Sequence, residues 1–157
     1  MAGFSVRDII TRTNDTNAYG AGDVIGAATG STAAVAFVFR PDAGAVRIRS
    51  SLMVVDAASV ISGETSYNLH FYDETPPSAL GDNAAWDLPS GDRANYVGTM
   101  SLGTPADIGS SLVITTNTLD LVMFAPTGTL WAYLVTVGAY TPTASRIYRI
   151  RLTGEAL

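Results

Sequence analysis

The sequence predicts an all-β protein built as an antiparallel β-sandwich, jelly roll or barrel. Short segments with alternating apolar and polar residues recur along the chain, and clusters of Gly, Pro, Asn, Asp and Ser separate them. No window of 12 residues carries the three-and-four apolar spacing of an amphipathic helix. With 157 residues and an apolar fraction of 47%, the chain is long and apolar enough for one domain with a packed core.

Two segments give the clearest strand predictions in the first third of the chain. Residues 33–40 are apolar on both faces, which predicts a central strand that is covered on both sides. Residues 46–54 alternate with a period of two, which predicts one buried and one solvated face. We expect the buried face to carry Val46, Ile48, Ser50, Leu52 and Val54, and the other face Arg47, Arg49, Ser51 and Met53.

Further strands are expected along the rest of the chain, over residues 67–72, 96–102, 111–116, 119–125, 130–137 and 147–152. The turn residues 126–129 predict a hairpin between the fourth and fifth of these strands. In the last strand, we expect Tyr148, Ile150 and Leu152 to share a face opposite Arg149 and Arg151. Residues 73–92 form a long irregular loop, which is a common place for function.

The N-terminal segment is expected to differ from the rest of the domain. Residues 1–26 are predicted to form an arm followed by a short strand, and residues 27–157 the sandwich domain. Because residues 14–22 are rich in turn formers, we expect the arm to pack weakly on its own domain and to contact a neighbour. Deleting residues 2–20 should then leave the sandwich folded. An ordinary edge strand is the alternative for the arm.

Composition excludes several kinds of chemistry and partner. The chain has no cysteine and one histidine, which removes thiol nucleophiles, cysteine-ligated metals and multi-histidine metal sites. The net charge is −5 and every basic residue is arginine, so nucleic acid and anionic membranes are poor candidate partners. No targeting signal or membrane span is recognisable, and we expect a soluble protein made in the cytoplasm.

No residue pattern predicts catalysis, and we expect neither enzymatic activity nor a cofactor or metal. His70 is the only candidate base of a serine triad, and no nucleophile motif accompanies it. Asp82, Asn83, Asp87 and Asp92 could offer oxygen ligands to calcium, but their spacing is that of ordinary turn residues. Trp86 could instead stack on a sugar, which leaves a carbohydrate-binding module as an alternative function.

The arginines point to a protein interface. Arg47 and Arg49 are expected on one outward strand face, and Arg149 and Arg151 on another. Such pairs suit bidentate contacts with carboxylates of a partner. A solvated strand face is the competing interpretation.

Three stretches together resemble one protein family over nearly the whole chain. They are residues 11–26 (TRTNDTNAYGAGDVIG), residues 82–88 (DNAAWDL) running on to 95–99 (NYVGT), and residues 130–142 (LWAYLVTVGAYTP) before the arginine-rich last strand. They resemble the capsid decoration, or cement, proteins encoded in the head gene clusters of tailed bacteriophages. The resemblance implies a β-sandwich, often jelly-roll-like, that binds the outside of the capsid, commonly as a trimer.

The resemblance also sets the expected partners and contact residues. It implies a non-enzymatic virion protein that binds the major capsid protein and itself. Residues expected to contact the capsid or a neighbouring subunit are Arg7, Arg12, Asp15, Tyr19, Arg47, Arg49, Trp86, Arg149 and Arg151. The alternative is a carbohydrate-binding β-sandwich of a phage tail or host-adhesion protein, with Trp86 in its site.

Overall fold

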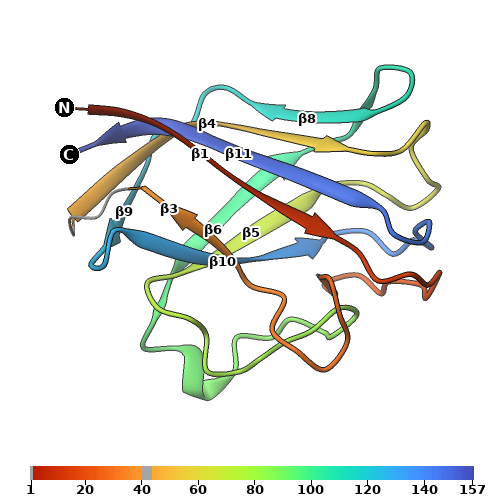
Figure 1. Cartoon of the computed structure of the whole chain (residues 1–157), viewed down its shortest axis with the longest axis horizontal. Helices are drawn as coiled ribbons and strands as arrows, with labels where there is room; N and C mark the ends of the chain where they lie inside the picture. The colour runs from red at the N-terminus through yellow and green to blue at the C-terminus, as the bar shows by residue number, and fades with distance from the viewer. Residues whose placement is uncertain (1, 40–43) are drawn as a thin grey trace.

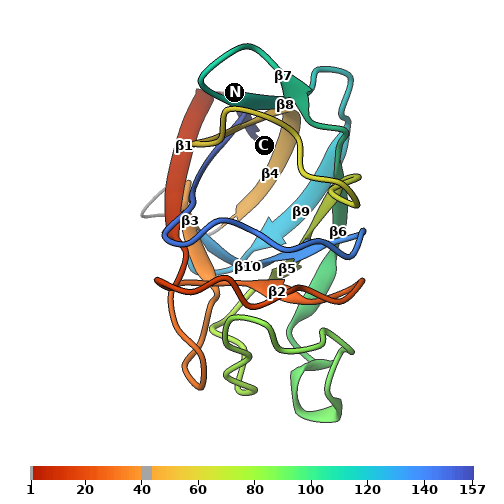
Figure 2. The ribbon, with the colours of Figure 1, turned by 90° about the vertical axis from the view of Figure 1, so that its right-hand side faces the viewer.

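A computed structural model describes residues 2–39 and 44–157, and its two antiparallel sheets pack face to face as a β-sandwich (Figures 1 and 2). The predicted all-β class is confirmed. The six-stranded sheet follows the order β1 (Ala2–Thr11), β11 (Ile147–Ala156), β4 (Gly44–Val55), β8 (Leu112–Thr116) and β7 (Ala106–Asp107), and β9 (Leu121–Ala125) also pairs with β4. The five-stranded sheet follows β2 (Val24–Ile25), β10 (Thr129–Thr136), β5 (Tyr67–Tyr72) and β6 (Tyr96–Gly103), and β3 (Val35–Val38) also pairs with β10.

The main core lies between the two sheets. The predicted face of the last strand is confirmed, because Tyr148, Ile150 and Leu152 of β11 are buried. They meet the inward residues of β5 from the opposite sheet, among them Leu69 and Phe71. Each such apolar side chain stabilises the fold by about 1.5–3 kcal/mol on burial. The one helical segment among the described residues is a 3-10 turn at Ser90–Asp92, and no helix there could cross a membrane.

A bulge in β4 changes which side chains face the core. In the pairing with β11, Thr153 lies opposite Ser50 and Gly154 opposite Ile48, so Arg49 is the extra residue. Alternation therefore shifts by one, and the prediction for residues 50–54 is wrong. Ser51, Met53 and Val55 are buried, while Leu52 and Val54 point outward. Gly154 permits the bulge, because a Cβ there would lie 1.9 Å from the carbonyl oxygen of Arg47.

Two other expectations about strands are also wrong. The segment predicted as a central strand forms β3, which pairs only with β10 among the described strands and leaves Val38 63% exposed. Its last predicted residue, Arg40, lies outside the described residues. The turn at 126–129 is present, but β9 and β10 belong to different sheets, so it links the layers and does not close a hairpin.

The N-terminal segment packs closely on its own domain. β1 pairs with β11 along its whole length, from Ala2 opposite Ala156 to Thr11 opposite Ile147. Figure 1 shows the two chain ends side by side for this reason. Tyr19 is only 2% exposed, so the prediction of weak packing is wrong and the edge-strand alternative describes β1. Deleting residues 2–20 would remove this strand and unfold part of the sheet.

The long loop covers the outer face of the five-stranded sheet. Residues 73–95 run from β5 to β6 at the bottom of Figure 1. There Leu80, Trp86 and Leu88 pack on Tyr72 and Tyr133, forming a second, smaller core. With the loop in place, this sheet has side-chain packing on both faces, whereas the outer face of the six-stranded sheet lies open.

Candidate functional site

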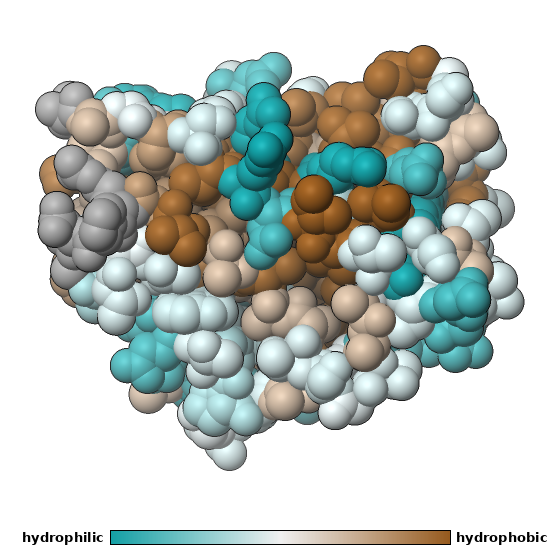
Figure 3. Space-filling view, in the orientation of Figure 1, coloured by the Kyte–Doolittle hydropathy of each residue, from teal (hydrophilic) through white to brown (hydrophobic). Residues whose placement is uncertain are grey.

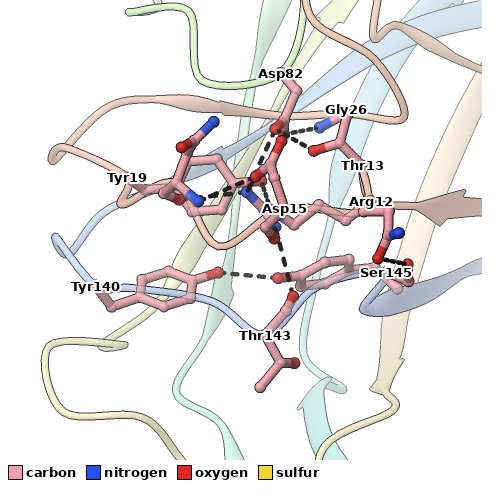
Figure 4. Close-up of polar contacts among 12 residues, drawn as sticks. Arg12, Thr13, Asp15, Tyr19, Gly26, Asp82, Tyr140, Thr143 and Ser145 are labelled. Carbon is pink, nitrogen blue, oxygen red and sulfur yellow. Dashed lines mark hydrogen bonds and ion pairs between the residues drawn. The ribbon is translucent and has the colours of Figure 1, made fainter.

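Arg12 lies at the centre of a buried polar network instead of at the surface. Its Nε donates to the Tyr19 hydroxyl at 2.6 Å, and its Nη2 donates to Asp15 at 2.7 Å. Asp82 accepts from the Tyr19 hydroxyl at 2.5 Å and from the amide of Gly26 at 2.9 Å (Figure 4). Burial raises the pKa of Tyr19, which therefore remains a hydrogen-bond donor. The network fastens the N-terminal segment to the long loop.

This geometry corrects the contact roles predicted for the segment. The Arg12 side chain is 0% exposed and Tyr19 is buried, so neither reaches a partner in this conformation. The Asp15 side chain is 32% exposed. A hydrogen bond from the amide of Asn17 lowers the Asp15 pKa, and its ion pair with Arg12 acts in the same direction. Of the four residues assigned to the arm, Arg7 has an exposed side chain free of this network.

A second buried ion pair fastens the neighbouring loops. Arg146 Nη2 lies 2.8 Å from Glu64 Oε1, and both side chains are 0% exposed. The guanidinium also lies over the rings of Tyr140 and Tyr148. Burial raises the pKa of Tyr140 to about 12. The ion pair and the neighbouring rings hold the Arg146 guanidinium in one place, which is the arrangement of a structural element, although its Nε and Nη1 atoms have no hydrogen-bond partner among the described residues.

Trp86 is held by its own domain. Its ring stacks on His70 with centroids 3.6 Å apart, and its Nε1 donates to the Tyr72 hydroxyl at 2.9 Å. Burial lowers the pKa of His70 to about 4, so the imidazole is neutral at pH 7. The tryptophan thus anchors the loop, and at least one face of its ring is unavailable to a sugar or a partner. His70 itself is buried beneath the tryptophan.

The acidic residues weighed as possible calcium ligands do not form a common site among the described residues. Asp82 belongs to the Arg12 network, and Asp92 is buried and accepts from the amide of Ser78 at 2.9 Å. Over residues 2–39 and 44–157, no three acidic or histidine side chains gather as a metal site would require.

Arg47 and Arg49 neutralise carboxylates of their own chain. Arg49 lies 2.8 Å from Glu155, and Arg47 lies 3.3 Å from Glu155 and 3.2 Å from Asp120. A hydrogen bond from Arg49 lowers the pKa of Glu155. The two arginines share an outward face, as predicted, and their charges are already paired.

The remaining predicted arginines meet on the outer face of the six-stranded sheet. In the pairing of β1 with β11, Arg7 lies opposite Arg151, and Ile9 lies opposite Arg149. On the other side of β11, Leu52 and Val54 of β4 occupy the same two rows. A groove of about 290 Å³ lies over these strands. We call it the arginine groove; its outward side chains are Arg7, Ile9, Leu52, Val54, Arg149 and Arg151.

The arginine groove carries positive charge without a matching carboxylate. No carboxylate in the described part of the chain lies within 4.0 Å of the guanidinium groups of Arg7, Arg149 and Arg151. Asp8 also lines the groove, but its oxygens accept from the amides of Ile9 and Ala36 at 2.8 and 3.0 Å. Like charges directly opposite each other in a sheet are destabilising. The cluster therefore carries a cost in the isolated chain.

The same sheet face is apolar at its other end. Phe124 and Val122 of β9 are 59% and 51% exposed, and Leu157 is 50% exposed beside Ala45. Large apolar side chains and arginines both favour protein interfaces. In Figure 3, hydrophobic and hydrophilic side chains lie side by side over the region where Figure 1 draws β1 and β11. We call this whole outer face of the six-stranded sheet the open face.

Sequence reasoning found the arginines but not their arrangement. The sequence predicts Arg7 in the N-terminal arm and Arg149 in a separate strand, and the β1–β11 register brings them together. The alternation predicts Leu52 and Val54 in the core. The apolar and polar residues up to Arg49 alternate regularly, so the sequence does not reveal the bulge there. The glycine at 154 was the available signal, since glycine inside a strand often marks a bulge.

Comparisons with known proteins leave the family open. No family model matches the chain, and no curated protein matches it. One similar solved structure is described as the structure of infectious bursal disease virus, Gt strain; the alignment covers 98% of this chain and 41% of that chain at 11% identity. Its TM-score is 0.20, which is too low to support an argument about fold or function.

Proposed function

We propose that this chain is a non-enzymatic phage virion protein that binds the outer surface of the capsid and stabilises it. The open face supports this proposal more than any other feature. It combines the unpaired arginines of the arginine groove with the exposed aromatic and aliphatic side chains of β9. A surface of this composition gains free energy when an acidic and apolar partner covers it.

The topology supports the jelly-roll part of the proposal. The main strands of one sheet run β1, β11, β4, β8, and those of the other run β3, β10, β5, β6. Consecutive strands thus alternate between the sheets over much of the chain, as in the double Greek key of a jelly roll. The resemblance of three sequence stretches to decoration proteins is the second support.

The assembled state is part of the same proposal. We infer that the partners are the major capsid protein and further copies of this chain, with a trimer favoured by the family resemblance, and that the site of action is the virion. The rigid construction of the domain suits this role, because buried ion pairs and aromatic clusters fix the loops at one end of the sandwich.

The decisive test uses capsids of the cognate phage prepared without this protein. Wild-type protein should sediment with them, and Phe124→Ser on the open face should reduce the bound fraction severalfold. Val38→Ser is the matched control, because Val38 is equally exposed but belongs to the other sheet. Electron microscopy should show added density on the shell. Absence of sedimentation of the wild-type protein would contradict the proposal.

A carbohydrate-binding function has less support in the structure. It was expected to use Trp86, whose ring stacks on His70 and whose indole N–H is bonded to Tyr72. A glycan array separates the two functions, since a specific signal lost in Trp86→Ala would favour the module.

A further inference from the structure

The arginine groove has a regular spacing that defines the kind of partner it fits. Arg149 and Arg151 are two residues apart on β11 and point to the same side, so their Cα atoms lie about 7 Å apart. Arg7 stands beside Arg151 on the neighbouring strand, about 5 Å away. An extended segment of another protein repeats its own side chains with the same period of about 7 Å.

The charge of the chain singles out this groove. The protein carries a net charge of −5, and its other arginines in the described part of the chain, except Arg93, are paired with carboxylates. Among residues 2–39 and 44–157, three guanidinium groups without a carboxylate partner gather only in the arginine groove. Arginine binds carboxylates in a bidentate manner, and such pairs are stronger than neutral hydrogen bonds.

The apolar side chains set a second requirement. Leu52 and Val54 flank the arginine pair on the β4 side, and Ile9 lies beside Arg149 on the β1 side. Ile9 is 52% exposed in the isolated chain. A strongly hydrated anion alone would leave this apolar surface wet, whereas a peptide with aliphatic neighbours to its carboxylates would cover it.

We propose that the arginine groove binds an extended acidic segment of the partner, with carboxylates at positions i and i+2 and aliphatic side chains next to them on the same face. The carboxylates contact Arg149 and Arg151, and Arg7 adds charge to the second contact. The methylene groups of the acidic side chains cover Leu52 and Val54, which occupy the same rows as the two arginines, and the aliphatic neighbours continue the apolar contact along the open face. This inference rests on the proposed function, and it names the chemistry of the surface that the open face recognises.

The test uses labelled nonapeptides and fluorescence anisotropy at low salt. The matching peptide is Thr-Val-Thr-Glu-Thr-Glu-Thr-Val-Thr, which places both glutamates and both valines on one face. A second peptide of the same composition carries adjacent glutamates, and a third carries glutamine in place of glutamate. We expect the matching peptide to bind about tenfold more tightly than either control, the effect of one charge-assisted contact.

Variants of the protein locate the site. Arg149→Gln and Arg151→Gln should each weaken binding of the matching peptide about tenfold. Arg93→Gln, an equal change of charge at an exposed residue on the far loop, should leave binding unchanged. Equal binding of both glutamate peptides, an equal loss in Arg93→Gln, or no binding by any peptide would each overturn the proposal. Tighter binding of inorganic polyphosphate than of the matching peptide would also overturn it.

Capsid sedimentation of the same variants separates this inference from the proposed function. Peptide binding without capsid binding would contradict the capsid role and leave the groove chemistry standing. Capsid binding that is unchanged in Arg149→Gln and Arg151→Gln would contradict the groove and leave the capsid role standing.

Discussion

Replacing Glu64 by glutamine tests how strongly the fold depends on its buried ion pair. Glu64 supplies the one carboxylate within ion-pair distance of Arg146 among the described residues, and both side chains are 0% exposed. The Nε and Nη1 atoms of Arg146 have no hydrogen-bond partner there either. Glu64→Gln keeps the size of the side chain and leaves a buried guanidinium without its counter-ion.

The expected loss is large for a domain of this size. Removing one partner of a buried pair costs about 3–5 kcal/mol, against a total free energy of unfolding of about 5–15 kcal/mol for a typical domain. At about 2–4 °C per kcal/mol for a chain of 150–250 residues, the melting temperature should fall by about 6–20 °C. Rings of Tyr140 and Tyr148 near the cation reduce the loss but do not replace the charge.

Urea unfolding followed by circular dichroism measures this loss, and a double-mutant cycle assigns it to the pair. Arg146→Met should also destabilise, while Glu64→Gln combined with Arg146→Met should be far more stable than the sum of the two losses predicts. A loss below about 1 kcal/mol in Glu64→Gln, or additive losses in the cycle, would refute the reasoning.

The remaining predictions concern a glycine, a histidine and the arginine groove. Gly154→Ala should destabilise the protein by several kcal/mol in urea unfolding, because its Cβ would lie 1.9 Å from the Arg47 carbonyl oxygen. The control is Gly91→Ala, since Gly91 is exposed and a Cβ there would have nothing within 4 Å; an equal loss in the two variants would contradict the bulge geometry. His70 has a pKa of about 4 in the folded chain, below its unfolded value of about 6.5. As the pH falls, the unfolded state therefore binds the proton first. The free energy of unfolding should drop by about 3 kcal/mol in total between about pH 6.5 and pH 4. Since His70 is the single histidine, one NMR imidazole signal reports this titration, and a midpoint near 6.5 would contradict it. Arg151→Gln should leave thermal stability unchanged or raise it slightly, because it removes a like-charge neighbour of Arg7; a fall of several degrees in a melting curve would show that the groove is structural.

The alternation of apolar and polar residues predicted which segments form strands better than it predicted how the strands pair. The alternation of Tyr148, Ile150 and Leu152 gave the correct buried face, because that half of β11 is regular. The same reasoning failed for residues 50–54, where one extra residue reverses every later side chain. Alternation records the direction of a side chain only while the partner strand keeps its register, and a single sequence does not contain that register.

The polar residues of the N-terminal segment show a different limit. Its turn formers correctly indicated an irregular path, but the partners of Arg12 and Tyr19 lie on segments distant in sequence, including Asp82. A buried arginine resembles an exposed one in sequence until its counter-ion is located. Trp86 shows the same limit, because the sequence predicts a contact with a partner or a sugar, whereas the structure packs its ring on His70 inside the domain.

The arginines in the described part of the chain therefore differ in burial and in ion pairing. This difference indicates which surface of the protein binds a partner. Arg12 and Arg146 are buried with carboxylates and hold loops in place. Those in β4 share Glu155 and Asp120 at the surface, where exposed pairs contribute little. The arginine groove has neither burial nor counter-ions, so its charges add nothing to the stability of the isolated chain. A cost to the isolated chain is expected where a surface is built for a partner. The open face is thus the first surface to test for binding.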